Sequence, residues 1–549
     1  MISIPILLSF ILTLTVLITS LAGTANSIML GTKKKTSRLV FAHFMIGATH
    51  NRKSASEYDE DMRIAKSLGI DAFALNIGTD PYTKQQLELA YESAAQNLMK
   101  VFISFDFNWW QTDRTTEIGH TIARFAARPA QLMVDNKVFV STFAGDGLDV
   151  AALRIAAGVP IFFAPNFHPA FGTDTTSVDG LFNWMAWPHN GGNKAPTRHS
   201  NISVADGDQV YINVLAGRAY VAPVSPWFFT HFGPEVPYSK NWIFPSDLLW
   251  YNRWHEILTM RPRFIEIVTW NDYGESHYTG PLHSPHTDDG ASKWVNDMPH
   301  DGWLEMAKPF IAAFKAGASS PDKYITSDRL IYWYRPALRN QNCDVTDTCV
   351  APAVNSSGNY FLGRPDGWQS VHDSVFVVAL LRSPALVQIN SGGRLYHYNA
   401  PAGAFAQAVP MHPGDQSFSV YRNGKTILEG TSLKQIINGC VCGLYNFNAY
   451  GKTSANRPII RNSSALFNVS IAVGSLPPTL KSSLQPDGLI SFSHGLQVQT
   501  CEAIPSLRSL AHPPSTSSTN NMPTEQTCIT SNLWGALSTV YAISSTSSI

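Results

Sequence analysis

The sequence predicts an α/β protein, with a (β/α)8 TIM-type barrel followed by an all-β, sandwich-like domain. Between residues 38 and 318, eight apolar strand-like segments alternate with segments whose apolar residues recur at helical spacing. Beyond residue 321, short β-branched or alternating runs are separated by Gly, Asn and Pro. Strands apolar on both faces and separated by amphipathic helices indicate a parallel sheet, and eight repeats over about 280 residues match a closed barrel.

The eight expected strands follow one another along the first part of the chain. They are Val40–Ile46, Ala72–Gly78, Val101–Phe107, Val138–Ala144, Pro160–Phe167, Gly180–Trp187, Ala219–Ser225 and Phe264–Trp270. The expected helices include Ser56–Leu68, Lys84–Met99, Thr115–Ala127, Leu148–Ala157 and Asp247–Met260. Between the fifth and sixth strands we expect a loop. A doubly wound open sheet is the competing fold, but no glycine-rich phosphate-binding turn opens the first unit.

The N-terminal residues predict export. An apolar run without charged side chains, Ile2–Leu21, precedes the small residues Ala22–Ala25. This order is typical of a secretory signal peptide, which we place at residues 1–25. A retained anchor is the alternative, because about 20 apolar residues can span a bilayer and the basic run Lys33–Lys35 follows. We expect a secreted glycoprotein, extracellular or in the cell wall, with sequons at Asn201, Asn355, Asn462 and Asn468.

The charge balance argues against a polyanionic partner. Lys+Arg and Asp+Glu number 40 each, and charged residues make up only 15% of the chain, so no global field attracts nucleic acid. The 14 Trp, 19 Tyr and 29 Phe suit carbohydrate stacking as well as a large core. A neutral polymer fits better as a partner, and we expect a monomer with no cofactor, no obligatory protein partner and no nucleic acid.

The C-terminal part divides into two expected regions. We place the all-β domain at residues 321–475, where it either binds polysaccharide or braces the barrel, and bracing is favoured because no linear aromatic platform stands out. All six cysteines lie beyond residue 340 and predict disulfides in an exported protein. Residues 476–549 are rich in Ser, Thr and Pro, which predicts a partly disordered tail.

The motif Trp270-Asn271-Asp272-Tyr273-Gly274-Glu275 at the end of the eighth strand is the most informative feature for function. It places two carboxylates three residues apart, where the strand ends of a barrel converge on one mouth. Paired carboxylates with a water between them can cleave a glycosidic bond by acid/base catalysis. An isolated Asp-x-x-Glu would more often cap a helix, so the position of this motif is what favours catalysis.

The third strand ends in Phe105-Asp106-Phe107-Asn108-Trp109-Trp110. Asp106 is a candidate third carboxylate, although a helix N-cap is the alternative reading. Two adjacent indoles at a barrel mouth indicate a sugar-lined cleft, although Trp109 packed under a neighbouring loop would explain half of this pattern.

Other strand ends add neutral hydrogen-bonding groups and aromatic rings, which match the hydroxyls and apolar faces of a glucan. Taken singly, each such residue more often has a structural role; Asn166, for example, is typical of a turn and His43 of a satisfied core histidine. The expected substrate-binding residues are His43, Asn76, Asn108, Trp109, Asn166, Trp187, Trp227, Trp270, Asn271 and Tyr273.

Competing chemistries lack their motifs. The chain contains no Gly-x-Ser-x-Gly elbow, no phosphate-binding loop and no His-Glu-x-x-His zinc motif. The scattered histidines have no partner set at helical spacing, so we expect no catalytic metal. The loop His283–Asp289 could hold a cation, but a mobile rim after the eighth strand is the favoured reading.

The order of these motifs closely resembles glycoside hydrolase family 71, the fungal α-1,3-glucanases or mutanases. The resemblance rests on Ala42-His43-Phe44-Met45, Ala72-Phe73-Ala74-Leu75-Asn76, Phe105-Asp106-Phe107-Asn108, Ala164-Pro165-Asn166-Phe167 and Trp270-Asn271-Asp272-Tyr273-Gly274-Glu275-Ser276. It implies an endo-acting hydrolase of α-1,3-glucan that inverts the anomeric carbon, on a (β/α)8 barrel followed by a β-sandwich. The family's essential acids correspond to Asp106, Asp272 and Glu275.

Inversion requires space for a water, which predicts roughly 6.5 to 9.5 Å between the working carboxyl groups. We expect Glu275 to be the general acid, its pKa raised by aromatic surroundings, and Asp272 the general base, with Asp106 positioning water or sugar. A non-catalytic glucan-binding wall protein and a wall-remodelling transglycosylase are the alternatives.

Overall fold

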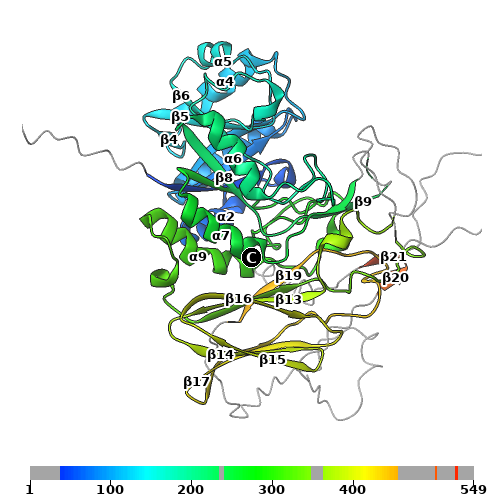
Figure 1. Ribbon diagram of the computed structural model, residues 1–549. Helices are drawn as coiled ribbons and strands as arrows, with labels where there is room; N and C mark the ends of the chain where they lie inside the picture. Colours follow the sequence, from blue (N-terminus) through cyan, green and yellow to red (C-terminus); the bar gives the residue numbers. More distant parts are fainter. Residues whose placement is uncertain are drawn as a thin grey trace, which may run out of the picture.

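The computed structural model describes residues 37–233, 236, 240–347, 363–454, 501–503 and 526–528. The expected signal peptide lies outside these residues, as does most of the expected tail. Within the described ranges, no helix is both long and apolar enough to cross a bilayer. The fold is mixed α/β. A curled parallel sheet with its helices occupies the upper part of Figure 1, and antiparallel sheets lie below it.

Eight parallel strands form the main sheet, and each coincides with a strand expected from the sequence. In sheet order they are β6 (Ile161–Phe163), β5 (Lys137–Phe143), β3 (Lys100–Asp106), β2 (Ala72–Ile77), β1 (Leu39–Met45), β11 (Phe264–Ile267), β8 (Ala219–Val224) and β7 (Gly180–Phe182). The short β4 (Met133–Val134) joins β5 in antiparallel fashion. Two backbone hydrogen bonds also connect the β6 and β7 segments: Asp179 N–H donates to Phe163 O (2.9 Å), and Phe182 N–H to Pro165 O (2.8 Å).

Helices connect most of these strands, as the sequence predicts. They are α2 (Asp59–Leu68), α3 (Thr83–Gln96), α4 (Thr115–Ala126), α5 (Val150–Ala157), α6 (Val204–Leu215), α7 (Leu249–Met260), α8 (Ser292–Val295) and α9 (Asp301–Ala316). Between β6 and β7 there is only the short 3-10 helix η3 (Pro169–Phe171), in agreement with the expected loop. A capping box formed by Ser203 and Asp206 begins α6.

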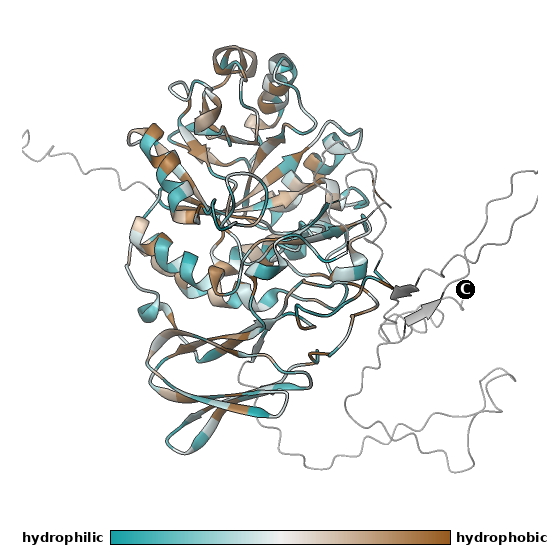
Figure 2. Ribbon diagram, turned by 45° about the vertical axis from the view of Figure 1, so that its right-hand side comes forward, coloured by the Kyte–Doolittle hydropathy of each residue, from teal (hydrophilic) through white to brown (hydrophobic). Residues whose placement is uncertain are grey.

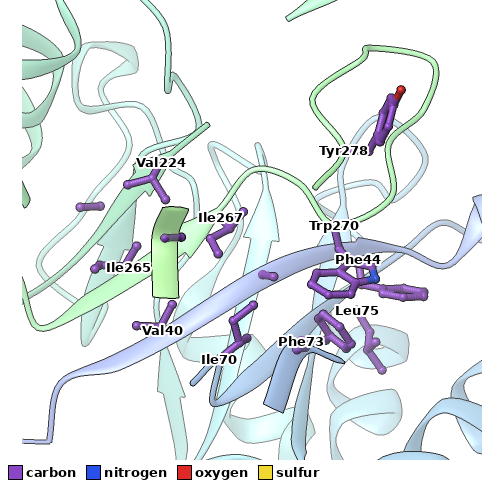
Figure 3. Close-up of a cluster of buried hydrophobic side chains, with 14 of the residues drawn as sticks. Val40, Phe44, Ile70, Phe73, Leu75, Val224, Ile265, Ile267, Trp270 and Tyr278 are labelled. Carbon is purple, nitrogen blue, oxygen red and sulfur yellow. The ribbon is translucent and has the colours of Figure 1, made fainter. Parts of the chain in front are cut away.

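Both faces of the parallel sheet are buried, which explains the near-continuous apolar strands. On one face, the ring of Phe41 lies 5.0 Å from that of Phe102 and 5.4 Å from that of Phe264. On the other, Phe73 lies 5.1 Å from Phe44 and 5.0 Å from Trp270, a cluster that Figure 3 shows beside the strands. Figure 2 shows the corresponding pattern, with brown strands inside and teal on much of the outer helical surface.

Two four-stranded antiparallel sheets follow. The first has the order β16 (Gly403–Pro410), β13 (Ser374–Leu381), β12 (Arg329–Tyr334) and β19 (Tyr450–Ser454). The second has the order β15 (Arg394–Ala400), β14 (Ala385–Ser391), β17 (Gln416–Arg422) and β18 (Lys425–Thr431). Tyr332 of β12 stacks on Phe418 of β17 at 4.1 Å, so the two sheets share an apolar core. Cys343 and Cys440 form a disulfide, which bears out one of the expected bridges.

These antiparallel sheets pack closely on the parallel part of the molecule. The buried His300, just before α9, contacts Asn448 Oδ1 (3.0 Å) and Ala449 O (2.9 Å) through Nε2. At the start of α9, Gly302 lies so near Lys452 that an added Cβ would come within 2.7 Å of its backbone. Only glycine permits this approach of helix to strand.

A buried ion pair fixes α6 and α7 to the sheet. Arg253 of α7 donates to both carboxylate oxygens of Asp208 in α6 (2.5 and 2.8 Å) and to Pro223 O of β8 (2.9 Å). The hydroxyl of Tyr220 also donates to Asp208 (2.5 Å). Removing Asp208 would leave the buried Arg253 with Glu256, which is 3.1 Å away and 45% exposed, as its remaining carboxylate partner.

We predict that Asp208→Ala lowers the free energy of unfolding by about 3–5 kcal/mol, because it leaves the buried Arg253 guanidinium with only the more exposed Glu256 (3.1 Å) as a counter-ion. Urea denaturation would measure the loss. Glu117→Ala is the matched control, since it removes a solvent-exposed pair with Arg114, for which less than about 1 kcal/mol is expected. Equal losses in the two variants would contradict the structural importance of the buried pair.

Candidate active site

Three carboxylates from distant segments come together at the carboxyl ends of β3 and β11. Asp106 is the last residue of β3, and Asp272 and Glu275 lie in the loop after β11. Burial raises the pKa of Asp106, the backbone N–H of Asn108 opposes this rise, and the nearby charge of Asp272 adds to it. Asp106 is 6% exposed, and the side chains of Asp272 and Glu275 are 18% and 16% exposed. The three acids therefore form one electrostatic cluster near the surface.

A hydrogen-bond network organises the loop after β11. The N–H of Glu275 donates to Oδ1 of Asp272 (3.0 Å), and the N–H of Asp272 donates to Oγ1 of Thr269 (2.9 Å). The buried imidazole of His277 contacts Oε2 of Glu275 through Nε2 (3.0 Å) and Oγ1 of Thr269 through Nδ1 (3.1 Å). Nε2 of His277 thus faces the carboxylate of Glu275, and Nδ1 faces the Thr269 hydroxyl.

Lys240 supplies the cation of the site. It is the first residue of β10 (Lys240–Ile243), and its ammonium contacts Oε1 of Glu275. Burial by itself would raise the pKa of Glu275, but the charge of Lys240 and the hydrogen bond from His277 lower it to about 2. The aromatic surroundings expected to raise this pKa are outweighed by the cation, so that expectation is wrong.

The pKa of Asp272 is shifted in the opposite direction, upward. Burial raises its pKa, His277 opposes the rise, and the negative charge of Glu275 adds to it. At neutral pH Glu275 is therefore the ionised member of the pair, and Asp272 is the member that holds a proton more readily.

Asp272, Glu275 and His277 bring one polar atom each close together. One oxygen of Asp272, one of Glu275 and a ring nitrogen of His277 lie within 4.8 Å of one another. Since this limit joins one oxygen of each side chain, the separation of roughly 6.5 to 9.5 Å expected between the carboxyl groups stays a prediction. Among the described residues, these three form the only group arranged to offer three metal ligands. The ammonium of Lys240 on Glu275 would repel a cation there, and a metal-free reaction stays a prediction.

The expected substrate-binding residues Trp270, Asn271 and Tyr273 instead anchor the loop. The indole N–H of Trp270, which is fully buried, donates to Oδ1 of Asp61 (2.9 Å). The Asn271 side chain accepts from the N–H of Met45 (2.7 Å) and donates to its carbonyl (3.1 Å), which ties the loop to the end of β1. Tyr273 is 7% exposed, and its hydroxyl donates to a backbone carbonyl.

Trp187 and Trp227 are also interior residues, so their expected role as sugar platforms is wrong. Trp187 is 1% exposed, stacks on Phe244 at 5.6 Å and donates its indole N–H to Trp227 O (2.9 Å). Trp227 is fully buried and donates to Phe447 O (3.0 Å). Rings enclosed in this way have no free face for a sugar.

The remaining expected residues divide into buried and accessible groups. His43 is fully buried and contacts Oε1 of Glu266 through Nδ1 (2.7 Å). Asn166 joins neighbouring strand ends, since it accepts from Ala144 N (3.2 Å) and donates to Phe182 O (2.9 Å). Asn166 thus has a structural role, whereas the buried Nε2 of His43 has no hydrogen-bond partner in the described part of the chain, so His43 is not the satisfied core histidine of the alternative reading.

Three residues stay close to the acids or open to solvent. Asn76 is 5% exposed, and its side chain hydrogen-bonds Asp106. Asn108 is exposed, and its N–H donates to Oδ1 of Asp106 (2.9 Å). Trp109 is 63% exposed, so its ring is available to a ligand.

Residues 36–463 match the family model described as glycosyl hydrolase family 71. The chain belongs to this family. A mutanase of Penicillium rubens is 42% identical over 419 residues, covering 75% of this chain and 88% of the relative. A glucan endo-1,3-alpha-glucosidase, agn1, of Schizosaccharomyces pombe is 35% identical over 434 residues, covering 75% and 94%. An ascus wall endo-1,3-alpha-glucanase of the same yeast is 28% identical over 444 residues, covering 75% and 96%.

Sequence reasoning missed two side chains that define the electrostatics of this family 71 site. His277 stands two residues after Glu275 and could have been included as part of the same motif. Lys240 precedes Glu275 by 35 residues, outside every expected strand and motif, so no local pattern indicates it. Its role depends on a chain reversal that only the fold reveals.

We predict a large stability effect for one tryptophan of this family 71 protein and almost none for another. Trp227→Ala should lower the free energy of unfolding by about 3–5 kcal/mol, because it leaves a large cavity. Trp109→Ala should change it by no more than about 0.5 kcal/mol, because the ring is mostly in water. Chemical denaturation of both variants checks the assignment, and a comparable loss for Trp109→Ala would place that ring in the packed interior.

Proposed function

We propose that this protein hydrolyses internal linkages of α-1,3-glucan. The observation that carries the proposal is the carboxylate pair after β11, in which Glu275 is held ionised while the pKa of Asp272 is raised. Acid/base cleavage of a glycosidic bond needs one protonated and one ionised carboxyl group. The substrate class follows from the names of the mutanase and the endo-1,3-alpha-glucosidase to which the chain is related.

In the proposed reaction, Asp272 donates its proton to the glycosidic oxygen while Glu275 accepts a proton from the attacking water. Water attacks the face opposite the leaving group, so the anomeric carbon inverts. This division reverses the one expected from the sequence, because Lys240 and His277 stabilise the ionised form of Glu275. One oxygen of each of these carboxylates lies within 4.8 Å of the other, and we infer that the water and the sugar enter between the two acids, with Asp106 orienting the sugar.

Two rings offer apolar faces to the sugar. Trp109 is largely exposed, and Trp184 is partly exposed, with its ring 4.9 Å from that of His43 and 6.3 Å from that of His277. We infer that Trp184 lies under the sugar at the cleavage point and that Trp109 and Asn108 contact a neighbouring unit. Flat aromatic faces suit the apolar face of a pyranose.

The finer architecture is part of the same proposal. A closed (β/α)8 barrel at residues 38–318 is supported by the two backbone hydrogen bonds between the β6 and β7 segments. A β-sandwich at residues 321–475 is supported by the shared core of the two antiparallel sheets. The tail at 476–549 remains a proposal from composition.

We further propose that the protein is secreted and acts as a monomer on wall polysaccharide, without nucleic acid or an obligatory protein partner. The apolar N-terminal run supports export, and the ascus wall relative supports a wall location.

Release of reducing sugar from insoluble α-1,3-glucan tests the proposed function. The purified protein should give a range of oligosaccharides early in the reaction, and the new reducing ends should first appear as the β-anomer by NMR. Binding without release would instead favour a glucan-binding wall protein. Products longer than an added oligosaccharide would favour a transglycosylase.

We predict that Asp272→Asn and Glu275→Gln each slow hydrolysis of the glucan by about 100-fold or more, because each removes one half of the acid/base pair. On a substrate with a good leaving group, Asp272→Asn should recover most of its kcat, because that group departs without protonation. Glu275→Gln should remain slow, since the water still lacks its base. If kcat on this substrate recovers only in Glu275→Gln, then Glu275 is the general acid and Asp272 the general base, as expected from the sequence.

A further inference from the structure

The cation of the site is carried by a hairpin outside the parallel sheet. Its strands β9 (Phe229–Phe232) and β10 pair in antiparallel fashion, with Lys240 opposite Phe232. The N–H of Phe229 donates to the backbone carbonyl of Glu275 (3.0 Å). Gly274 lies so close to the Phe232 ring that a Cβ there would come within 3.0 Å of it. The hairpin therefore rests directly on the loop that bears Asp272 and Glu275.

A buried ion pair holds this hairpin from its other side. His231 Nε2 lies 2.8 Å from Oδ2 of Asp347, and both side chains are fully buried. His231 Nδ1 lies 2.7 Å from Oδ1 of Asn241, whose amide nitrogen donates to Gly363 O (2.7 Å). Both ring nitrogens face acceptors, so His231 carries two protons and a positive charge. The pair thus joins both strands of the hairpin to Asp347.

Asp347 is itself fastened to the segments around the antiparallel sheets. Its N–H donates to the carbonyl of Cys343 (2.9 Å), which is linked to Cys440 by the disulfide. Its carboxylate also accepts the N–H of Tyr445 (2.6 Å). A continuous set of contacts therefore runs from the disulfide through Asp347 and His231 to the strand that begins with Lys240.

We propose that the β9–β10 hairpin is a positioning element of the active site, held by the His231–Asp347 pair so that Lys240 keeps Glu275 in its ionised form. The inference rests on the proposed function, in which Glu275 is the base. It gives the segments that follow the parallel part of the molecule a role in catalysis, because they fix the place of Lys240.

The charges around Glu275 leave Lys240 as the decisive group. From its own loop, Glu275 is faced by Asp272 and His277, and from the hairpin by Lys240. Lys240 also interacts with Asp272 and with Asp289 of the following loop. Without the ammonium, His277 would be left to oppose the effect of burial. The pKa of Glu275 would then rise from about 2, and the base would be lost at a higher pH.

We predict that Lys240→Met moves the acid limb of the kcat/KM profile on α-1,3-glucan oligosaccharides upward by about one pH unit or more. Lys240→Arg keeps a cation beside Glu275, so the acid limb of its kcat/KM profile should lie at the same pH as in the wild-type protein. The ¹³C NMR titration of the Glu275 carboxyl group in both variants gives the same comparison without turnover. A wild-type protein that hydrolyses nothing would contradict the proposed function, whereas an unchanged Glu275 titration in Lys240→Met would contradict this inference.

Asp347→Asn tests the remote part of the inference. Asp347→Asn should move the acid limb of the kcat/KM profile and the Glu275 titration upward in pH, as Lys240→Met does, but by a smaller amount. In a protein that already carries Lys240→Met, it should cause no further shift. Asp344→Asn, three residues earlier and bonded to the Tyr445 hydroxyl (2.7 Å), is the control and should leave both unchanged. His231→Gln replaces Asp347→Asn if that variant does not fold. If Asp347→Asn shifts the acid limb by the same amount in the wild-type protein and in Lys240→Met, the inference is overturned.

Discussion

The site depends on keeping two acidic side chains close together where little water reaches them. Two like charges within 4.8 Å of each other cannot both be ionised at low cost. The structure resolves this conflict by giving the two acids different neighbours. Glu275 receives an ammonium and an imidazole N–H, and Asp272 receives burial and the charge of Glu275. The difference in proton affinity that acid/base chemistry needs is therefore present before a substrate binds.

The parallel sheet fixes the position of this pair through the segment that leaves β11. Trp270 is packed on Phe73 and bonded to the buried Asp61, and Asn271 forms two hydrogen bonds with Met45 at the end of β1. The backbone thus has little freedom immediately before Asp272. Side chains that resemble a sugar platform in the sequence are the ones that make the loop rigid, and rigidity is what a site needs to hold its reacting groups in place.

Much of the fold, and the grouping of three acids at strand ends, could be predicted from local patterns. Strands buried on both faces are apolar throughout, and Asp106 ends β3 while Asp272 and Glu275 lie in the loop that follows β11. The exposure of single tryptophans could not be predicted, because the partner that covers Trp227 is the carbonyl of Phe447, 220 residues further on. The roles of the acids depend on Lys240, whose position is set by a hairpin and by contacts with residues beyond 340.

The His231–Asp347 pair indicates what those later segments contribute. Burying two charges costs several kcal/mol per ion, and well-packed apolar side chains in their place are often as stable or more so. Stability alone therefore gives a weak reason for a fully buried imidazolium and carboxylate. A charged pair differs from an apolar contact in that it is satisfied in only one relative position of its two segments. Here those segments are the hairpin that carries Lys240 and the loop fastened by the Cys343–Cys440 disulfide. This requirement for one relative position allows segments far along the chain to fix the charge of Lys240 beside Asp272 and Glu275.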